Sequence, residues 1–437
     1  MSGPSTPSSP RAPAPLPPDG SPPASPESLI YDWNQAEAAP RPPQPFGLID
    51  ETLRDGIQSP SATHPSLEDK LELLELIQAI GVDSVNLGMP CSSPRALADA
   101  VAMSRHIQAR RLTLTPAVAG RTVLGDVERA LDVVQQGGMP VVLYVFIGAS
   151  TLRQWAEGWN LDFLAKASAS AISLAVREGL EVAFVTEDTS RASPEILDPL
   201  FRTALGHGAR RLVLCDTVGH ATPAGARALV RWTRRLIAST GVPGQVEWHG
   251  HNDRGLSLDN ALAALSAGAD RLQACGLGVG ERVGNTAMDV LLLNLKLLGW
   301  YEHDLSRLAD YTRKVSEALC IPIPFNHPLS GRDAFRTGTG VHASAIIKAL
   351  GRDDGRLADH LYSSIPAREF GREQRIEVGF MSGLSNVRFW LESRGLPSNE
   401  PLCQELLAWA KGRDSLPREE EILQVVDASH YRKQTAG

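Results

Sequence analysis

The chain has 437 residues, of which 43% are hydrophobic and 21% charged, and its formal net charge is -7. This length provides enough apolar material for a large core with an accessory region, while the acidic balance and the dispersed Lys and Arg residues argue against a nucleic-acid partner. The sequence has neither an apolar run of about 18 residues nor an apolar stretch after a basic start, so we expect no membrane span, no secretory signal and a cytoplasmic location.

Residues 1–45 are dominated by Pro, Ser and Ala and show almost no apolar periodicity. Such a segment buries too little apolar surface to offset the entropy lost on ordering. We therefore expect a disordered tail over residues 1–45, with Ile30, Tyr31 and Trp33 as a candidate docking segment.

From Phe46 onward, short β-like runs alternate with amphipathic helical stretches. The expected strands are 48–50, 84–87, 112–116, 141–147, 181–185, 211–214, 245–248 and 271–274. The expected helices are 67–80, 94–108, 123–136, 161–178, 194–206, 223–240, 257–267 and 285–298. Eight β/α units in roughly 250 residues predict an α/β fold, a (β/α)8 TIM barrel over residues 46–299. A doubly wound sheet is the alternative, disfavoured because no Gly-rich dinucleotide fingerprint follows the first strand.

Beyond residue 300 the alternation stops and helical patterns dominate. The expected helices are 305–319, 340–350, 386–394 and 401–411. We therefore expect a small, mainly helical C-terminal accessory region over residues 300–437.

Polar motifs follow five of the expected strands. In chain order they are DETLRDGIQ, TEDTSR, DTVGHATP, WHGHND and GVGERVGN, after strands one, five, six, seven and eight. Because active sites of TIM barrels lie at the C-terminal ends of the strands, these motifs predict an active site there.

The pair His249 and His251 is the strongest single signal of a metal site. Residues i and i+2 of a strand point to the same side, so both imidazoles can reach one ion. Asp55 and Asn285 are expected on neighbouring strand ends, which gives a mixed N/O set suited to Mg²⁺, Mn²⁺ or Zn²⁺. The alternative is a pair of ordinary structural histidines.

These motifs, in this order, resemble the acyl-CoA-handling Claisen-condensation branch of the TIM-barrel metalloenzymes. That branch includes isopropylmalate and homocitrate synthases and 3-hydroxy-3-methylglutaryl-CoA lyase, and the resemblance runs from about residue 47 to 391. It implies three metal ligands and a fourth or water-linked one, which are Asp55, His249, His251 and Asn285. It also implies that Arg54 stabilises an enolate, that Thr217 holds the carboxylate of a 2-oxo acid, and that Gln58 and Glu187 line the reacting centre.

The segments AFRTGTGVHASAIIKAL and LYSSIPAREFGR resemble the post-barrel region of the synthases. The resemblance places His342 on a catalytic histidine and Tyr362 on a tyrosine near the thioester. It further implies a homodimer in which this region crosses to the partner barrel. The alternative is that His342 only starts a helix and that Tyr362 packs at its foot.

The resemblance implies condensation of acetyl-CoA, or another acyl-CoA, with a 2-oxo acid, followed by thioester hydrolysis. A carbon–carbon lyase is the alternative, although the Gly-Cys-Pro loop of the lyases is missing, and a catalytically silent relative is a third. The segment GASTLRQWAEG resembles homocitrate synthases in spacing and supplies Arg153 as a substrate-binding residue. Trp155 and Ala156 stand where homocitrate synthases have His and Ser. We therefore expect the acceptor, the 2-oxo acid, to have an apolar side chain whose binding pocket Trp155 shapes.

Overall fold

A computed structural model describes residues 25–36, 41–42, 45–352 and 354–435 of the chain. It divides into two compact units, one formed by Ala39–Ile323 and the other by the N-terminal segment with Pro324–Gly437. None of the described helices is long and apolar enough to span a membrane.

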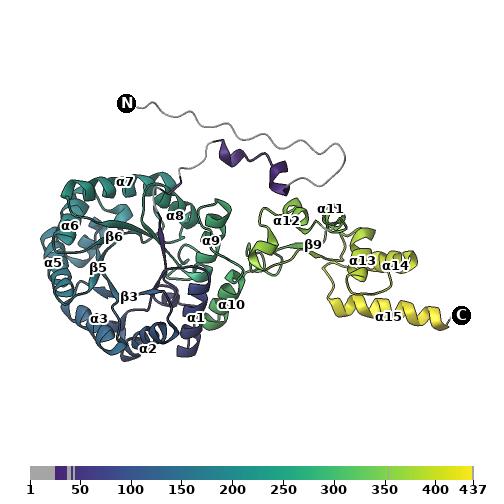
Figure 1. Cartoon of the computed structure of the whole chain (residues 1–437), viewed down its shortest axis with the longest axis horizontal. Coiled ribbons are helices and arrows are strands. Elements are labelled where there is room, and N and C mark those ends of the chain that lie inside the picture. Colours follow the sequence, from purple (N-terminus) through teal and green to yellow (C-terminus); the bar gives the residue numbers. More distant parts are fainter. Residues whose placement is uncertain (1–24, 37–40, 43–44, 353, 436–437) are drawn as a thin grey trace. The chain divides into compact units, whose positions relative to one another are not determined.

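The first unit is built around a closed barrel of eight parallel strands (Figure 1). The strands are β1 Gly47–Asp50, β2 Ser84–Asn86, β3 Thr115–Arg121, β4 Val142–Gly148, β5 Glu181–Glu187, β6 Arg211–Asp216, β7 Gln245–Gly250 and β8 Arg271–Ala274. Pairing of β8 with β1 closes the barrel and confirms the predicted TIM-barrel fold. Strand β3 spans Thr115–Arg121, whereas the expected strand covered residues 112–116. The sequence pattern did not show its second half because Ala and Gly carry little β propensity.

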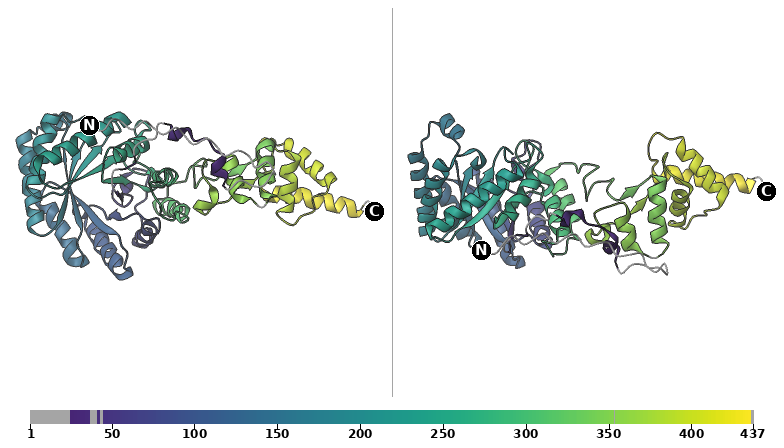
Figure 2. Two further views of the ribbon diagram at one scale, coloured as in Figure 1. Left: turned by 45° about the horizontal axis from the view of Figure 1, so that its top comes forward. Right: turned by 90° about the horizontal axis from the view of Figure 1, so that it is seen from above.

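Helices surround the strands, as Figure 2 shows. They are α1 Leu67–Ala79, α2 Pro94–Arg110, α3 Leu124–Gly137, α4 Thr151–Glu157, α5 Leu161–Arg177, α6 Pro194–Gly206, α7 Pro223–Thr240, α8 Ser257–Ser266, α9 Met288–Leu297 and α10 Leu308–Leu319. Several begin at a side chain that accepts a hydrogen bond from a backbone N–H of the first turn, namely Ser66, Ser93, Ser150, Asn160 and Thr222. The short helix α4 follows β4 directly and was not expected.

The barrel interior is filled mostly by small and medium side chains from alternate strand positions. This inner cluster includes Ile49, Ala117, Ala119, Val142, Tyr144, Ala183, Val213 and Cys215. Because the interior is packed, space for a ligand is left only above it, at the carboxyl ends of the strands.

Helix α10 belongs to the barrel unit, although we assigned its residues to the accessory region. The Tyr311 hydroxyl donates to the buried Asp50 carboxylate at the end of β1. Lys314 pairs with Asp69 on α1 at 2.8 Å. These contacts tie the helix to the first β/α unit.

The second unit is mainly helical. Its elements are α11 Gly340–Leu350, α12 Gly355–Leu361, α13 Leu384–Glu392, α14 Glu400–Lys411, α15 Glu419–Thr435 and a two-stranded sheet of β9 Arg336–Thr337 and β10 Arg375–Ile376. Val387, Trp390, Leu402 and Leu406 form the centre of one buried cluster. This agrees with the helical accessory region predicted after the barrel.

Part of the N-terminal segment packs on this second unit, whereas residues 1–24 of the expected tail lie outside the described residues. Residues Pro26–Leu29 and Trp33–Gln35 form two 3-10 helices. Pro26 is buried, and the Glu27 carboxylate lies 3.0 Å from Nε2 of His360 on α12. The contacts therefore come from Pro26 and Glu27, and not from the expected docking residues Ile30, Tyr31 and Trp33, which are exposed.

Candidate active site

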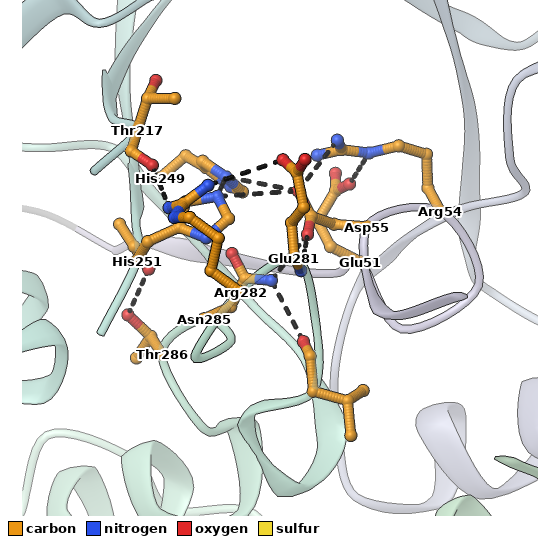
Figure 3. A network of polar contacts seen from close by, with 12 residues as sticks. Glu51, Arg54, Asp55, Thr217, His249, His251, Glu281, Arg282, Asn285 and Thr286 are labelled. Carbon is orange, nitrogen blue, oxygen red and sulfur yellow. Dashed lines mark hydrogen bonds and ion pairs between the residues drawn. The ribbon is translucent and has the colours of Figure 1, made fainter. Parts of the chain in front are cut away.

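Asp55, His249 and His251 converge at the carboxyl end of the barrel (Figure 3). Asp55 lies in the turn after β1, His249 near the end of β7, and His251 directly after that strand. The two Nε2 atoms are 3.2 Å apart, and Asp55 Oδ2 lies 3.6 Å from that of His249 and 3.8 Å from that of His251. The spacing of the two histidines in the sequence predicted this convergence.

The protonation states of these three groups suit a metal ion. Burial lowers the pKa of both imidazoles, and for His249 the repulsion of His251 lowers it further, so both rings are neutral near pH 7. Burial opposes the charge on Asp55, but Arg54 and the two imidazoles outweigh it and hold the pKa of that carboxyl below its ordinary value. The site therefore presents one anionic oxygen and two imidazole lone pairs.

Asn285 adds an unpaired oxygen at this site. Its Nδ2 donates to Asp55 Oδ1 at 2.9 Å and to the Val279 carbonyl at 3.0 Å. Its Oδ1 is buried and has no hydrogen-bond partner within the described part of the chain. Such an oxygen needs a partner, and a hard divalent cation would provide one. The donor set therefore fits a divalent ion.

In the loop after β8, the backbone at Gly280 passes close to the side chains of Asp55 and Asn285. Gly280 has φ of +155°, and a Cβ added there would meet the Asn285 amide and lie 2.8 Å from Asp55 Oδ1. Only glycine allows the backbone to pass this close. Arg282 braces the same loop by a bidentate pair with Asp253, at 2.9 and 3.0 Å.

Arg54 is fixed at the edge of the site by two carboxylates. Its Nε donates to Glu51 Oε2 at 2.6 Å and its Nη1 to Asp55 Oδ2 at 3.0 Å. Glu51 is fully buried and also accepts a hydrogen bond from Asn86 Nδ2 at 3.1 Å. Sequence reasoning did not give Glu51 a role, although its position three residues before Arg54 in DETLRDG was a signal.

A cavity of about 120 Å³ lies at this end of the barrel, and Arg54, Asp55, His249 and His251 are among its lining residues. Three other predicted residues also line it, namely Gln58, Glu187 and Thr217. Burial raises the pKa of Glu187, against the opposing attraction of Arg153 and Arg54. The Thr217 hydroxyl accepts a hydrogen bond from the Asp188 backbone N–H at 2.7 Å, which leaves its own proton to donate. The structure thus brings these residues to the same cavity as Asp55, His249 and His251.

Two residues of the segment after β4 lie outside the cavity. Arg153 pairs with Glu157 at 3.0 Å and approaches Glu187 to only 3.9 Å. Trp155 is 86% exposed, so the expectation that it shapes the acceptor pocket is wrong. The reason is that α4 turns this side chain outward, which the sequence spacing alone did not reveal.

His342 and Tyr362 come together in the second unit. Their rings stack with centroids 4.0 Å apart and an interplanar angle of 26°. His342 is exposed and Tyr362 is 48% exposed.

Sequence reasoning missed most of the apolar cavity wall. Strands of parallel sheets are hydrophobic on both faces, so the pattern did not show which side chains turn inward. The missed lining residues are Met89, Ala119, Tyr144, Phe146, Val185 and Cys215, together with the polar Gln273.

Comparisons with known proteins agree with this arrangement. The HMGL-like family model matches residues 46–315. The chain is 32% identical to a homocitrate synthase from Methanopyrus kandleri, over 82% of this chain and 85% of that protein. It is 29% identical to a probable 2-isopropylmalate synthase from the same organism, over 84% and 70%. A solved hydroxymethylglutaryl-CoA lyase from Pseudomonas aeruginosa has the same barrel fold, with a TM-score of 0.53 and 20% identity over 63% of this chain and 93% of that one.

Proposed function

The chain belongs to the HMGL-like family, and we propose that it condenses an acyl-CoA, acetyl-CoA in the first instance, with a 2-oxo acid and then hydrolyses the thioester. The products would be a 2-alkylmalate-type acid and free CoA. The convergence of Asp55, His249 and His251 at the barrel mouth carries the proposal. The named synthases support it further, because their similarity covers 82% and 84% of the chain and so extends past the barrel.

We assign a divalent ion to Asp55, His249 and His251, with Asn285 as a fourth or water-linked ligand. A bound ion would supply Lewis-acid polarisation of the keto group of the 2-oxo acid. The unpaired Asn285 oxygen and the neutral imidazoles support this assignment.

The remaining cavity residues act on the two substrates. The free Thr217 hydroxyl proton donates to the carboxylate of the 2-oxo acid, and Gln58 lies within the same cavity to bind substrate. Arg54 keeps a fixed positive charge where the thioester oxygen becomes negative during proton removal. The raised pKa of Glu187 makes this carboxylate a stronger base than an exposed one. Arg153, paired with Glu157, would bind substrate only after that pair opens.

We propose that His342 and Tyr362 complete the site in a homodimer. His249 and His251 would use their lone pairs to hold the ion and could not then accept the proton of the acyl α-carbon. The stacked, exposed pair of His342 and Tyr362 is suited to act on a partner chain. Mixing inactive His342→Ala and Asp55→Ala proteins should restore part of the activity, and verified subunit exchange without recovery would contradict this arrangement.

Thiol release tests the condensation directly. We expect free CoA only when acetyl-CoA and a 2-oxo acid are both present with Mg²⁺ or Mn²⁺. Cleavage of 3-hydroxy-3-methylglutaryl-CoA, without thiol release from the substrate pair, would instead support the lyase. His251→Ala should abolish activity and bound metal while the circular dichroism spectrum is retained. His207→Ala is the matched control, because His207 bonds to Ser173 on the outer helices, away from the cavity.

A further inference from the structure

The lining of the cavity indicates which 2-oxo acid accepts the acyl group. We infer that this acceptor is a 2-oxo monocarboxylic acid with a short apolar side chain, and that Phe146 and Val185 select that side chain. This inference rests on the proposed condensation and narrows its second substrate.

The cavity has a polar side and an apolar side. The metal ligands, Arg54 and Thr217 form the polar side. Across from them the lining includes Ala119, Phe146 and Val185, from three consecutive strands. Phe146 on β4 and Val185 on β5 are register partners, so the two side chains form a continuous apolar wall. A 2-oxo acid held by its carboxylate and keto group would direct the rest of its carbon chain to this wall.

Several other polar groups that line the cavity already have partners within the protein. The Tyr144 hydroxyl donates to Glu247 at 2.8 Å, and Gln273 Nε2 donates to the same carboxylate at 3.0 Å. Asn86 Nδ2 is shared between the two oxygens of Glu51. Burial raises the pKa of the Cys215 thiol, which stays neutral. These groups therefore leave no donor for a second carboxylate of the acceptor.

Charge in the cavity excludes such a carboxylate as well. Of the described residues that line it, Arg54 is the only Lys or Arg, and both Glu51 and Asp55 already pair with it. Glu187 and Glu281 add negative charge to the lining. Arg153 lies outside the lining and pairs with Glu157 at 3.0 Å, so it offers a counter-ion only if that pair opens. While the pair is closed, a distal carboxylate would lose its hydration and face other carboxylates, whereas an apolar side chain would lose only its contact with water.

The test compares acceptors in the thiol-release assay on the intact protein with acetyl-CoA and Mg²⁺ or Mn²⁺. We expect kcat/KM for the best of pyruvate, 2-oxobutyrate and 2-oxoisovalerate to exceed that for 2-oxoglutarate by at least about 100-fold. Equal or better turnover of 2-oxoglutarate would overturn the acceptor inference and leave the condensation intact. Absence of thiol release with every acceptor would overturn the proposed function and the inference with it.

A size change tests the two named residues. Phe146→Ala should raise kcat/KM for 2-oxo-4-methylpentanoate relative to that for pyruvate by about tenfold, because it deepens the apolar wall. Misfolding would lower both values together and leave their ratio unchanged. Phe163→Ala on the outer helix α5 is the matched control, since Phe163 is 46% exposed. Val185→Ala provides a second test. An unchanged ratio in both cavity variants, with the circular dichroism spectrum and the turnover of pyruvate retained, would refute the assignment.

Discussion

Replacement of Arg54 by Met should damage both stability and activity, and the structure separates the two effects. Glu51 is fully buried, and in this variant it loses the one guanidinium that pairs with it among the described residues, although it keeps the hydrogen bonds from Asn86. Removing one member of a buried ion pair costs about 3 to 5 kcal/mol, and the remaining bonds place the expected loss near the lower end, at about 3 kcal/mol. Losing the fixed charge beside the reacting centre should reduce kcat by about 100-fold or more.

The double variant Arg54→Met, Glu51→Gln distinguishes these effects, because a neutral amide at position 51 needs no counter-ion. Urea unfolding should show most of the stability restored, while thiol release stays low. The pH dependence provides a second check. Burial raises the pKa of Glu51, and in the single variant no Arg54 opposes it. Stability of the single variant should therefore be lost as pH rises from the ordinary Glu value of 4.5 through the raised folded value. Recovered turnover in the double variant would show that Arg54 is only structural, and an undiminished unfolding free energy in the single variant would refute the pairing argument.

Burial raises the pKa of Asp50 from 3.8 to about 6, so its contribution to stability is lost as pH rises through this window, by about 3 kcal/mol. Asp50→Asn should flatten the pH profile of unfolding there, and identical profiles would contradict this. Deleting residues 1–36, but not 1–24, should lower the calorimetric Tm of the second unit by about 2 to 4 °C; equal melting of the two truncations would show that the docked segment is not stabilising. Gly280→Ala should weaken metal binding to the apoprotein at least about tenfold by titration calorimetry. The control Gly255→Ala also has a positive φ, +70°, but open space around the added Cβ, so comparable losses in both would point to backbone strain and not to the contact with Asn285 and Asp55.

The barrel and the convergence of Asp55, His249 and His251 could be predicted because the β/α alternation and the spacing of the two histidines are both visible in the sequence. His249 and His251 share a strand face whatever the tertiary structure, and closure of an eight-stranded barrel brings the end of β8 to Asp55. The direction of a side chain on the short helix α4 does not follow from such spacing. Trp155 was therefore expected in the pocket, whereas it is exposed. The docking of Pro26 and Glu27 depends on two isolated contacts inside a segment whose composition is typical of disorder.

Closure of the barrel at β1 and β8 also affects how the site is assembled during folding. Asp55 and Asn285, joined by a hydrogen bond at 2.9 Å, are 230 residues apart in the chain. Contacts of such long sequence separation form late, because the loop between them must first lose its entropy. Partly folded chains would therefore lack the ion-binding geometry, and an ion that binds only the closed barrel would stabilise the seam between its first and last strands. The supply of metal in the cell would then influence the fraction of molecules that remain folded as well as their catalytic rate.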